Sequence, residues 1–126
     1  MRLHHLALTI QNENEVGLFY EQLLGFKLIR KFELNAELAL QIFDFNKNVR
    51  VFQLEGHGII LELFMDETAK QNNYNHWCLS FPDREAFIKK AQNQHVEIIR
   101  IPRENHDILF VKDFSGNIFE IKEDEI

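Results

Sequence analysis

A faint internal repeat constrains this chain more than any other feature of its sequence. The segments His5–Thr9 and His76–Ser80 are short, mostly apolar stretches that begin with His, and each is followed by polar residues and then a helical pattern. Each half later contains an apolar run interrupted by a Glu, at Ile60–Phe64 and at Ile118–Lys122. Because a unit repeated in this way packs against its copy, the sequence predicts two related modules.

Hydrophobic periodicity predicts the same order of elements in each half, a strand, a helix and three more strands. In the first half we expect a helix over Asn12–Leu24, ended by Gly25, with four side chains on its buried face, Val16, Phe19, Tyr20 and Leu23. The strands Phe26–Phe32 and Val49–Leu54 follow. The connection between them lengthens this half, and within it Ala36–Phe43 is rich in helix formers, which predicts a short extra helix.

The second half repeats the plan in a shorter form. A helix is expected over Asp83–Gln94, followed by the strands Val96–Ile101 and Ile108–Lys112, and one face of the helix would carry Ala86, Phe87, Lys90 and Ala91. No Pro-, Gly- or Ser-rich linker separates the halves. We therefore expect a single α+β domain over residues 1–126, with a first module at about 1–68 and a second at about 72–126.

Composition and charge exclude several classes of partner. Hydrophobic residues make up 45% of the chain, charged residues 27%, and the formal net charge is -6 at pH 7. Nucleic acids and anionic membranes are bound through clustered Lys and Arg, and a spanning helix needs about 20 apolar residues, so we expect neither partner. The single Cys78 excludes an intrachain disulfide, and the first residues carry no secretion signal, which predicts a cytoplasmic protein.

Strand periodicity places the repeated His and Glu on defined faces. Alternate residues of a strand share a face, so His5 lies with Ala7, whereas its neighbour His4 lies on the other side. Glu62 and Glu120 each interrupt an apolar run in the middle of a predicted strand. A carboxylate that points into the concave face of a sheet requires a partner or a metal ion, because an isolated buried charge is costly.

Each of these positions has a structural interpretation as well as a functional one. A single strand His is more often a hydrogen-bonded structural residue, and a strand Glu often faces water. Their recurrence at matched places in two copies instead favours a divalent metal site formed by His5, Glu62, His76 and Glu120. Two imidazoles and two carboxylates suit a first-row ion without identifying it, so zinc, nickel, cobalt, manganese and iron all stay candidates.

Three segments resemble the vicinal oxygen chelate superfamily, which includes glyoxalase I, methylmalonyl-CoA epimerase, bleomycin-binding and fosfomycin resistance proteins, and extradiol dioxygenases. They are His5–Leu8, Phe19–Phe26 and Phe110–Glu120. The last segment is similar to the family's strand, Asp-Pro-x-Gly-Asn turn and ligand-bearing strand, with Phe114 where Pro is usual. The likeness extends over nearly the whole chain.

The resemblance implies paired βαβββ modules that form a cupped mixed sheet with helices on the outside, and a metal ion held in the cup of a homodimer. His5, Glu62, His76 and Glu120 match the family's four ligand positions. Ring-cleaving dioxygenases and fosfomycin transferases generally use three ligands and lack a counterpart of Glu62, so the resemblance is nearest to four-ligand glyoxalase I or epimerase-like members. Whether one chain or two complete each site stays open.

Two positions depart from the pattern of glutathione-dependent glyoxalase I. Thr9 stands where Arg is usual, and Asp66 where Asn is usual. The missing Arg removes a charge-assisted contact to a glutathione carboxylate, and the sequence offers three other cations, Arg50, Lys112 and Arg103. The segment Ala36–Phe43 resembles an insertion of non-glutathione members that could form one wall of the cavity.

The implied activity is that of a lyase or isomerase that removes a proton next to the carbonyl of a small 2-oxo or thioester substrate, with the metal stabilising the enediolate. Glu120 is the first candidate for the base and Glu62 the second. Cys78, on the strand face of His76, is either a reactive thiol or, as is commoner, a small buried hydrophobe. A non-catalytic small-molecule binding or resistance protein and a metal-dependent dioxygenase are the alternatives.

Overall fold

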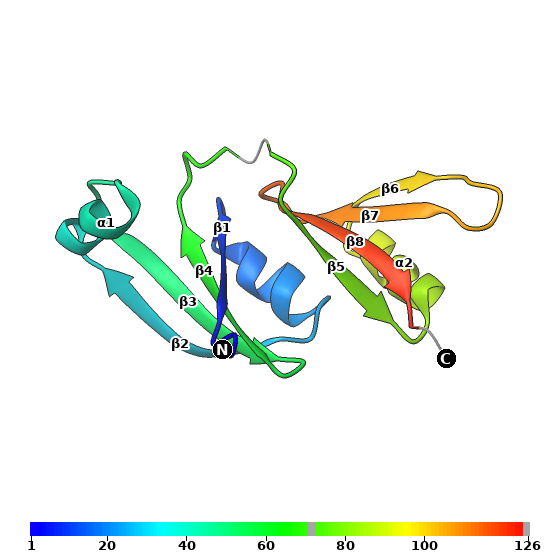
Figure 1. The fold of residues 1–126 in the computed structure, drawn as a ribbon, viewed down its shortest axis with the longest axis horizontal. Helices are drawn as coiled ribbons and strands as arrows, with labels where there is room; N and C mark the ends of the chain where they lie inside the picture. Colours follow the sequence, from blue (N-terminus) through cyan, green and yellow to red (C-terminus); the bar gives the residue numbers. More distant parts are fainter. Residues whose placement is uncertain (71–72, 125–126) are drawn as a thin grey trace. The chain divides into compact units, whose positions relative to one another are not determined.

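The computed structural model describes residues 1–70 and 73–124, and it divides into two compact units, Met1–Ala69 and Lys70–Ile126. Residue 72, at which the second module is predicted to begin, and the last two residues lie outside the described part. Each unit contains its own four-stranded sheet and its own helical segments (Figure 1).

The first unit runs from the N-terminus through four strands and two helical segments. Its elements are β1 (Leu6–Ile10), the π-helix η1 (Val16–Glu21), β2 (Lys27–Leu34), α1 (Ala36–Phe43), β3 (Val49–Gly56) and β4 (Ile59–Met65). The strand order is β1-β4-β3-β2, with β1 parallel to β4 and the other neighbours antiparallel. The extra helix predicted between two strands is confirmed as α1.

The second unit repeats this arrangement without the extra helix. Its elements are β5 (His76–Phe81), α2 (Arg84–Asn93), β6 (Glu97–Ile101), β7 (Ile108–Lys112) and β8 (Ile118–Glu123). The strand order β5-β8-β7-β6, with β5 parallel to β8, matches that of the first sheet. The predicted fold class is therefore confirmed as two βαβββ-like modules. No helix in the described ranges combines the length and apolar character needed to cross a membrane.

The helix of the first module ends at a glycine, as the sequence predicts. The amide of Gly25 donates to the Glu21 carbonyl at 3.1 Å, and the amide of Phe26 donates to the Tyr20 carbonyl at 2.9 Å. This bond to the carbonyl six positions earlier closes around a left-handed residue at the helix end, and Gly25 adopts φ 79°. Gly25 therefore turns the chain directly from η1 into β2.

The apolar core of the first module lies on one face of its sheet. Leu61 and Leu63 of β4 are fully buried, as are Phe19 and Tyr20 of η1. Val16 and Leu23 are buried as well, so the predicted buried face of this helix is confirmed. Because alternate residues of a strand face opposite ways, Glu62 between the two leucines points away from this core.

The buried face of α2 differs from the predicted one. Phe87, Ile88 and Ala91 are buried, whereas Ala86 and Lys90 are exposed. The helix begins one residue later than predicted, after Asp83, whose carboxylate accepts a hydrogen bond from the Ala86 amide at 3.0 Å. The prediction gave too much weight to a regular stripe through Lys90 and missed Ile88, which packs with its neighbours against the sheet.

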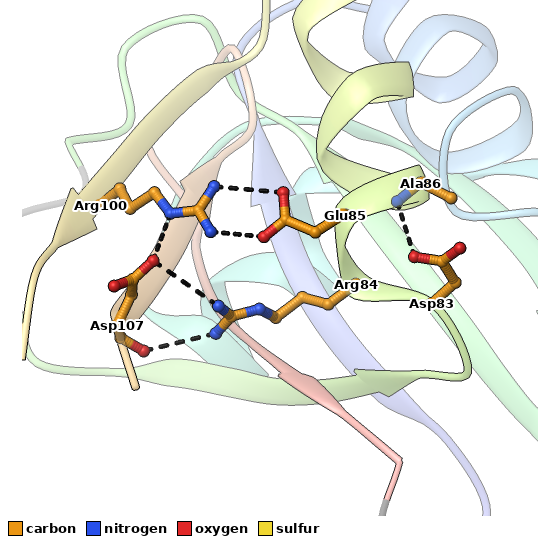
Figure 2. A network of polar contacts seen from close by, with 6 residues as sticks. All are labelled: Asp83, Arg84, Glu85, Ala86, Arg100 and Asp107. Carbon is orange, nitrogen blue, oxygen red and sulfur yellow. Dashed lines mark hydrogen bonds and ion pairs between the residues drawn. The ribbon is translucent and has the colours of Figure 1, made fainter. Parts of the chain in front are cut away.

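A network of charged side chains ties α2 to the hairpin that follows it (Figure 2). The Arg100 guanidinium on β6 binds the carboxylates of Glu85 on α2 and Asp107 before β7. Arg84 of α2 donates to the Asp107 carbonyl at 3.3 Å and lies 3.8 Å from its carboxylate. These contacts attach the helix to both ends of the β6–β7 connection.

Candidate metal centre

The first module brings His5 and Glu62 together. Ala7 of β1 pairs with Glu62 of β4, and His5 lies two residues before Ala7, just ahead of the strand. The Nε2 atom of His5 is 3.5 Å from a carboxylate oxygen of Glu62. The other Glu62 oxygen accepts a hydrogen bond from the Gln53 amide at 3.0 Å, across the β3–β4 pair. Glu62 is thereby held in one orientation with its first oxygen turned toward His5.

The second module repeats the pair in the same register. Cys78 of β5 pairs with Glu120 of β8, and His76 lies two residues before Cys78. The Nε2 atom of His76 is 3.9 Å from a Glu120 carboxylate oxygen. On the far side of Glu120, at the place that Gln53 takes in the first module, stands Phe110, which cannot donate a hydrogen bond. The two carboxylates thus have matched positions and different supports.

The two histidines stand at the beginnings of their strands. His5 precedes β1, and His76 is the first residue of β5. Both rings therefore lie where the chain enters the sheet and the backbone pairing begins. The two glutamates are inside their strands, as predicted.

Hydrogen bonds determine which ring nitrogen each His can offer to a metal. The Nδ1 atom of His76 lies 2.9 Å from the Tyr74 carbonyl, and a carbonyl only accepts, so Nδ1 carries the proton. Nε2 is then the unprotonated nitrogen, and it faces Glu120. The Nδ1 atom of His5 is instead 2.9 Å from Nδ1 of His4. His4, set aside on strand periodicity, orients the ring of His5.

The chemistry and spacing of each pair fit adjacent ligands of one ion. Two donors at about 2.1 Å from an ion lie about 3.0 Å apart in octahedral geometry and about 3.4 Å apart in tetrahedral geometry. The separation of 3.5 Å in the first module meets this requirement, and that of 3.9 Å in the second needs a small side-chain rotation. Within the described residues no group of three or more His, Cys, Asp or Glu side chains forms a metal cluster. Each module therefore supplies two of the four predicted ligands.

Cys78 is exposed, so the interpretation of it as a small buried hydrophobe was wrong. Cys78 lies opposite Glu120 on the neighbouring strand, and this position affects the pKa of its thiol. Desolvation and the negative charge of Glu120 raise the pKa of the Cys78 thiol above its usual value. The thiol is therefore kept protonated at neutral pH, and Cys78 is not an activated nucleophile.

Asp66, one of the two residues that depart from the glutathione pattern, has hydrogen-bond partners. Asp66 accepts hydrogen bonds from Lys47 at 2.8 Å and from Thr68, and although burial opposes them, these contacts lower the pKa of Asp66. Of the three cations considered as substitutes, Arg50 binds Glu13 at 2.8 Å and Lys112 lies 3.6 Å from Glu97. The third, Arg103, lies exposed after β6.

Sequence reasoning missed Gln53. Its alternation with Phe52 and Leu54 shows that it lies opposite the core face of β3, but it does not show which residue of β4 it meets. That depends on the register between the two strands, which the sequence pattern alone leaves undetermined. The Tyr74 carbonyl was missed for a similar reason, because a backbone acceptor has no side-chain signal.

Comparison with known proteins identifies the family. The sequence profile of the Glyoxalase/Bleomycin resistance protein/Dioxygenase superfamily matches residues 2–121. The chain therefore belongs to this superfamily, the vicinal oxygen chelate superfamily of the sequence analysis. None of the curated proteins matches the chain.

Solved structures share the fold at low sequence identity. A glyoxalase family protein from Enterococcus faecalis is 22% identical over 95% of both chains, with a TM-score of 0.70. The trypanothione-dependent glyoxalase I of Leishmania major is 19% identical over 98% of this chain and 86% of its own, with a TM-score of 0.73.

A third similar structure contains a metal ion. It is a point mutant of the fosfomycin resistance protein FosX from Listeria monocytogenes, complexed with Mn(II) and 1S,2S-dihydroxypropylphosphonic acid. This protein is 16% identical over 99% of this chain and 94% of its own, with a TM-score of 0.72. At these identities the likeness establishes the fold alone.

Proposed function

We propose that the protein is a divalent-metal-dependent lyase or isomerase of the glyoxalase type that acts on a small 2-oxo or thioester substrate. One observation carries the proposal above all others. Each of the two modules presents a His imidazole beside a Glu carboxylate, in the same register of equivalent sheets. A pair that served only one module's stability would have no reason to recur at the matched place of the other.

His5, Glu62, His76 and Glu120 would hold the ion, which is zinc, nickel, cobalt, manganese or iron. An ion bound there supplies Lewis acidity next to the substrate carbonyl. Each module offers two donors, whereas a divalent ion takes four or more ligands. A complete site therefore requires both kinds of module, from one chain or from the two chains of a homodimer in the cytoplasm.

We assign the base to Glu120 because its carboxylate is the more exposed of the two and has no amide donor among the described residues. Glu62 receives a hydrogen bond from Gln53, and its side chain is 12% exposed. Glu120 faces Phe110 in place of an amide donor, and its side chain is 28% exposed. A carboxylate that accepts a proton from carbon has to be reached by the substrate, so the more exposed residue suits this role. Glu62 is the second choice.

The alternatives of the sequence analysis make different predictions. A non-catalytic binding or resistance protein has no need of matched metal donors, so it would bind a small molecule without a metal ion. A dioxygenase would require ferrous iron and oxygen for turnover. Neither alternative accounts for the second carboxylate, Glu62, beside His5.

Exchange of substrate hydrogen with solvent tests the proposed reaction. Protein stripped of metal and reloaded with each of the five ions is mixed in D2O with hemithioacetals of methylglyoxal and with branched acyl thioesters. Deuterium at the carbon next to the carbonyl is followed by NMR. We expect metal-dependent exchange, reduced by about 100- to 10,000-fold in Glu120→Gln, the range that a general base contributes.

Glu123→Gln is the matched control, because Glu123 is an exposed residue at the end of the same strand. It should exchange like the native chain. Absence of exchange with every ion and every substrate, or equal rates in Glu120→Gln and the native chain, would rule out the proposed reaction.

A further inference from the structure

The face of the first sheet that carries Glu62 also carries a cation. Residues that pair directly across neighbouring strands point to the same face, and Glu62 of β4 pairs with Gln53 of β3, which pairs with Arg30 of β2. Ala7 of β1 completes this row on the other side of Glu62. The row thus extends from beside His5 to Arg30 across all four strands.

Arg30 is held in place by an aromatic ring. Its guanidinium carbon Cζ lies 4.5 Å from the ring centroid of Phe32, two residues further along β2 and on the same face. Such stacking limits the movement of a long side chain and leaves the edge of the planar guanidinium free to donate.

Two other cations of this module, Arg50 and Lys47, are neutralised by carboxylates. Arg50 binds Glu13, and Lys47 binds Asp66, each at 2.8 Å. By contrast, none of the described carboxylates forms an ion pair with Arg30, which is exposed. Arg50 also lies on the opposite sheet face, because it is next to Val51 in β3 and Val51 shares the face of Gln53. Arg30 is therefore a stacked, solvent-facing cation in the row of a proposed metal ligand.

We propose that Arg30 binds an oxyanion, a carboxylate or a phosphate, at the end of the substrate remote from the reacting carbonyl. The guanidinium edge matches the two oxygens of either group and can form two parallel charge-assisted hydrogen bonds. The identification of the bound group as part of the substrate rests on the proposed function, whereas oxyanion binding by Arg30 does not. In a chain of net charge -6, such a local cation is needed to attract an anionic molecule.

The spacing of the strands sets the length of the substrate. Glu62 and Arg30 are two strands apart, and strands are separated by about 4.8 Å, so their backbones are about 10 Å apart. A carbonyl held beside His5 and Glu62 would then be followed by an arm of several bonds that ends in the oxyanion. Acyl thioesters and hemithioacetals of anionic thiols have this form.

Titration of the metal-free protein with inorganic phosphate and, separately, with acetate tests oxyanion binding by itself. The side-chain Nε–H signals of arginine are followed by 15N NMR, and the signal missing in Arg30→Ala identifies Arg30. We expect a saturable shift of the Arg30 signal. In Lys31→Ala the affinity for the anion should fall by no more than twofold. Lys31 is the matched control, because it is the next residue of β2 and lies near Phe52, on the other face.

Arg30→Lys keeps the charge and loses the planar edge, so phosphate should bind it about tenfold more weakly. Binding of phosphate but not of acetate would identify a phosphate site. Binding of both anions would identify a site for either oxyanion. No saturable shift of the Arg30 signal with either anion, or equal effects of Arg30→Ala and Lys31→Ala on binding, would overturn the proposal.

A second measurement connects the subsite to the substrate. The metal-loaded chain is assayed with methylglyoxal hemithioacetals of 3-mercaptopropionate, which is anionic, and of 2-mercaptoethanol, which is neutral. Arg30→Ala should raise KM about tenfold for the anionic compound and leave the neutral one and kcat unchanged. Equal changes for both compounds would exclude Arg30 from substrate binding. Inactivity of the native chain toward both, together with absence of exchange in the acyl thioesters, would refute the proposed function and leave the anion titration to decide on Arg30.

Discussion

At the scale of single residues, Gln53 distinguishes the two halves of the candidate centre. Its amide donates to one oxygen of Glu62, so the other oxygen stays directed toward His5. The matched position in the second module holds Phe110 beside Glu120. The same backbone plan thus supports one carboxylate fixed by an amide donor and one that lies beside Cys78 and Lys122 and is more exposed.

Replacing Gln53 by Leu should weaken metal binding by about 10- to 100-fold, the usual cost of losing a group that orients a ligand. The shape of the side chain is nearly preserved, and only the donor to Glu62 is removed. Competition with a chelator of known affinity measures the effect. Gln92→Leu, at an exposed site of α2, serves as the control. A Gln53→Leu protein that holds metal as tightly as the control would contradict the role assigned to Gln53.

The residue types of the candidate centre could be predicted from the sequence, and their immediate surroundings could not. His5, Glu62, His76 and Glu120 are marked by repetition, which is visible in a single sequence. The contacts of Gln53 and Arg30 depend on strand register, and β2 even contains an irregularity between Leu28 and Arg30 that shifts the pairing. Periodicity cannot locate such a bulge.

At the scale of elements, two glycines of the first helical segment have opposite roles. Gly25 has φ 79°, in the left-handed region, whereas Gly17 lies within η1 and a methyl group there would meet no atom within 4 Å. Gly25→Ala should lower the free energy of unfolding by about 1–2 kcal/mol, because an L residue is strained in this conformation.

Gly17→Ala, the matched control, should raise it by up to about 1 kcal/mol, since alanine restricts the unfolded chain and favours the helix. Urea unfolding of both variants measures the two changes. Equal effects of the two substitutions would contradict the assignment of Gly25 as the helix end.

The charged network of α2 and the β6–β7 hairpin predicts a dependence of stability on pH. The hydrogen bond from Arg100 lowers the pKa of Glu85 below its usual value. A carboxyl group with a lowered pKa stabilises the fold above its unfolded-state pKa, about 4.3, and loses this effect as the pH falls through the folded value. Glu85→Gln should therefore lower Tm slightly at pH 7 and progressively less below about pH 4.

Thermal unfolding monitored by circular dichroism at several pH values tests this. The difference should also disappear in an Arg100→Gln background, in which Glu85 has lost its partner. A Tm difference that is the same at pH 3 and pH 7 would contradict the network's contribution. Because Glu85 is exposed, high salt should reduce the effect.

Most elements could be predicted from periodicity because helices and strands differ in their apolar repeat. The segment rich in helix-forming residues, Ala36–Phe43, coincides with α1. Asn35 caps the start of this helix. The π-helical geometry of η1 was not predictable, because its five-residue hydrogen bonds, such as that from the Gln22 amide to the Gly17 carbonyl, depend on packing of the whole turn. The buried face of α2 also differs from the predicted one because of tertiary packing, which buries Ile88.

At the scale of the whole molecule, the chain is a duplicated module in which each copy presents one His beside one Glu. The superfamily establishes the fold, and the paired His and Glu side chains provide the chemistry from which we infer a metal-dependent reaction. Two donors from one module would bind an ion only weakly, since a divalent ion in protein normally has at least four ligands. Metal binding is thus a property that one module by itself should lack.

Metal content measured by elemental analysis tests this central claim most directly. The native chain, purified without chelators or affinity metals, is compared with Glu120→Ala and with Glu123→Ala, the exposed control on the same strand. We predict about one divalent ion per subunit in the native chain and the control, and a loss or strong reduction in Glu120→Ala. A native chain that stays free of metal after incubation with zinc, nickel, cobalt, manganese and ferrous iron would contradict the account.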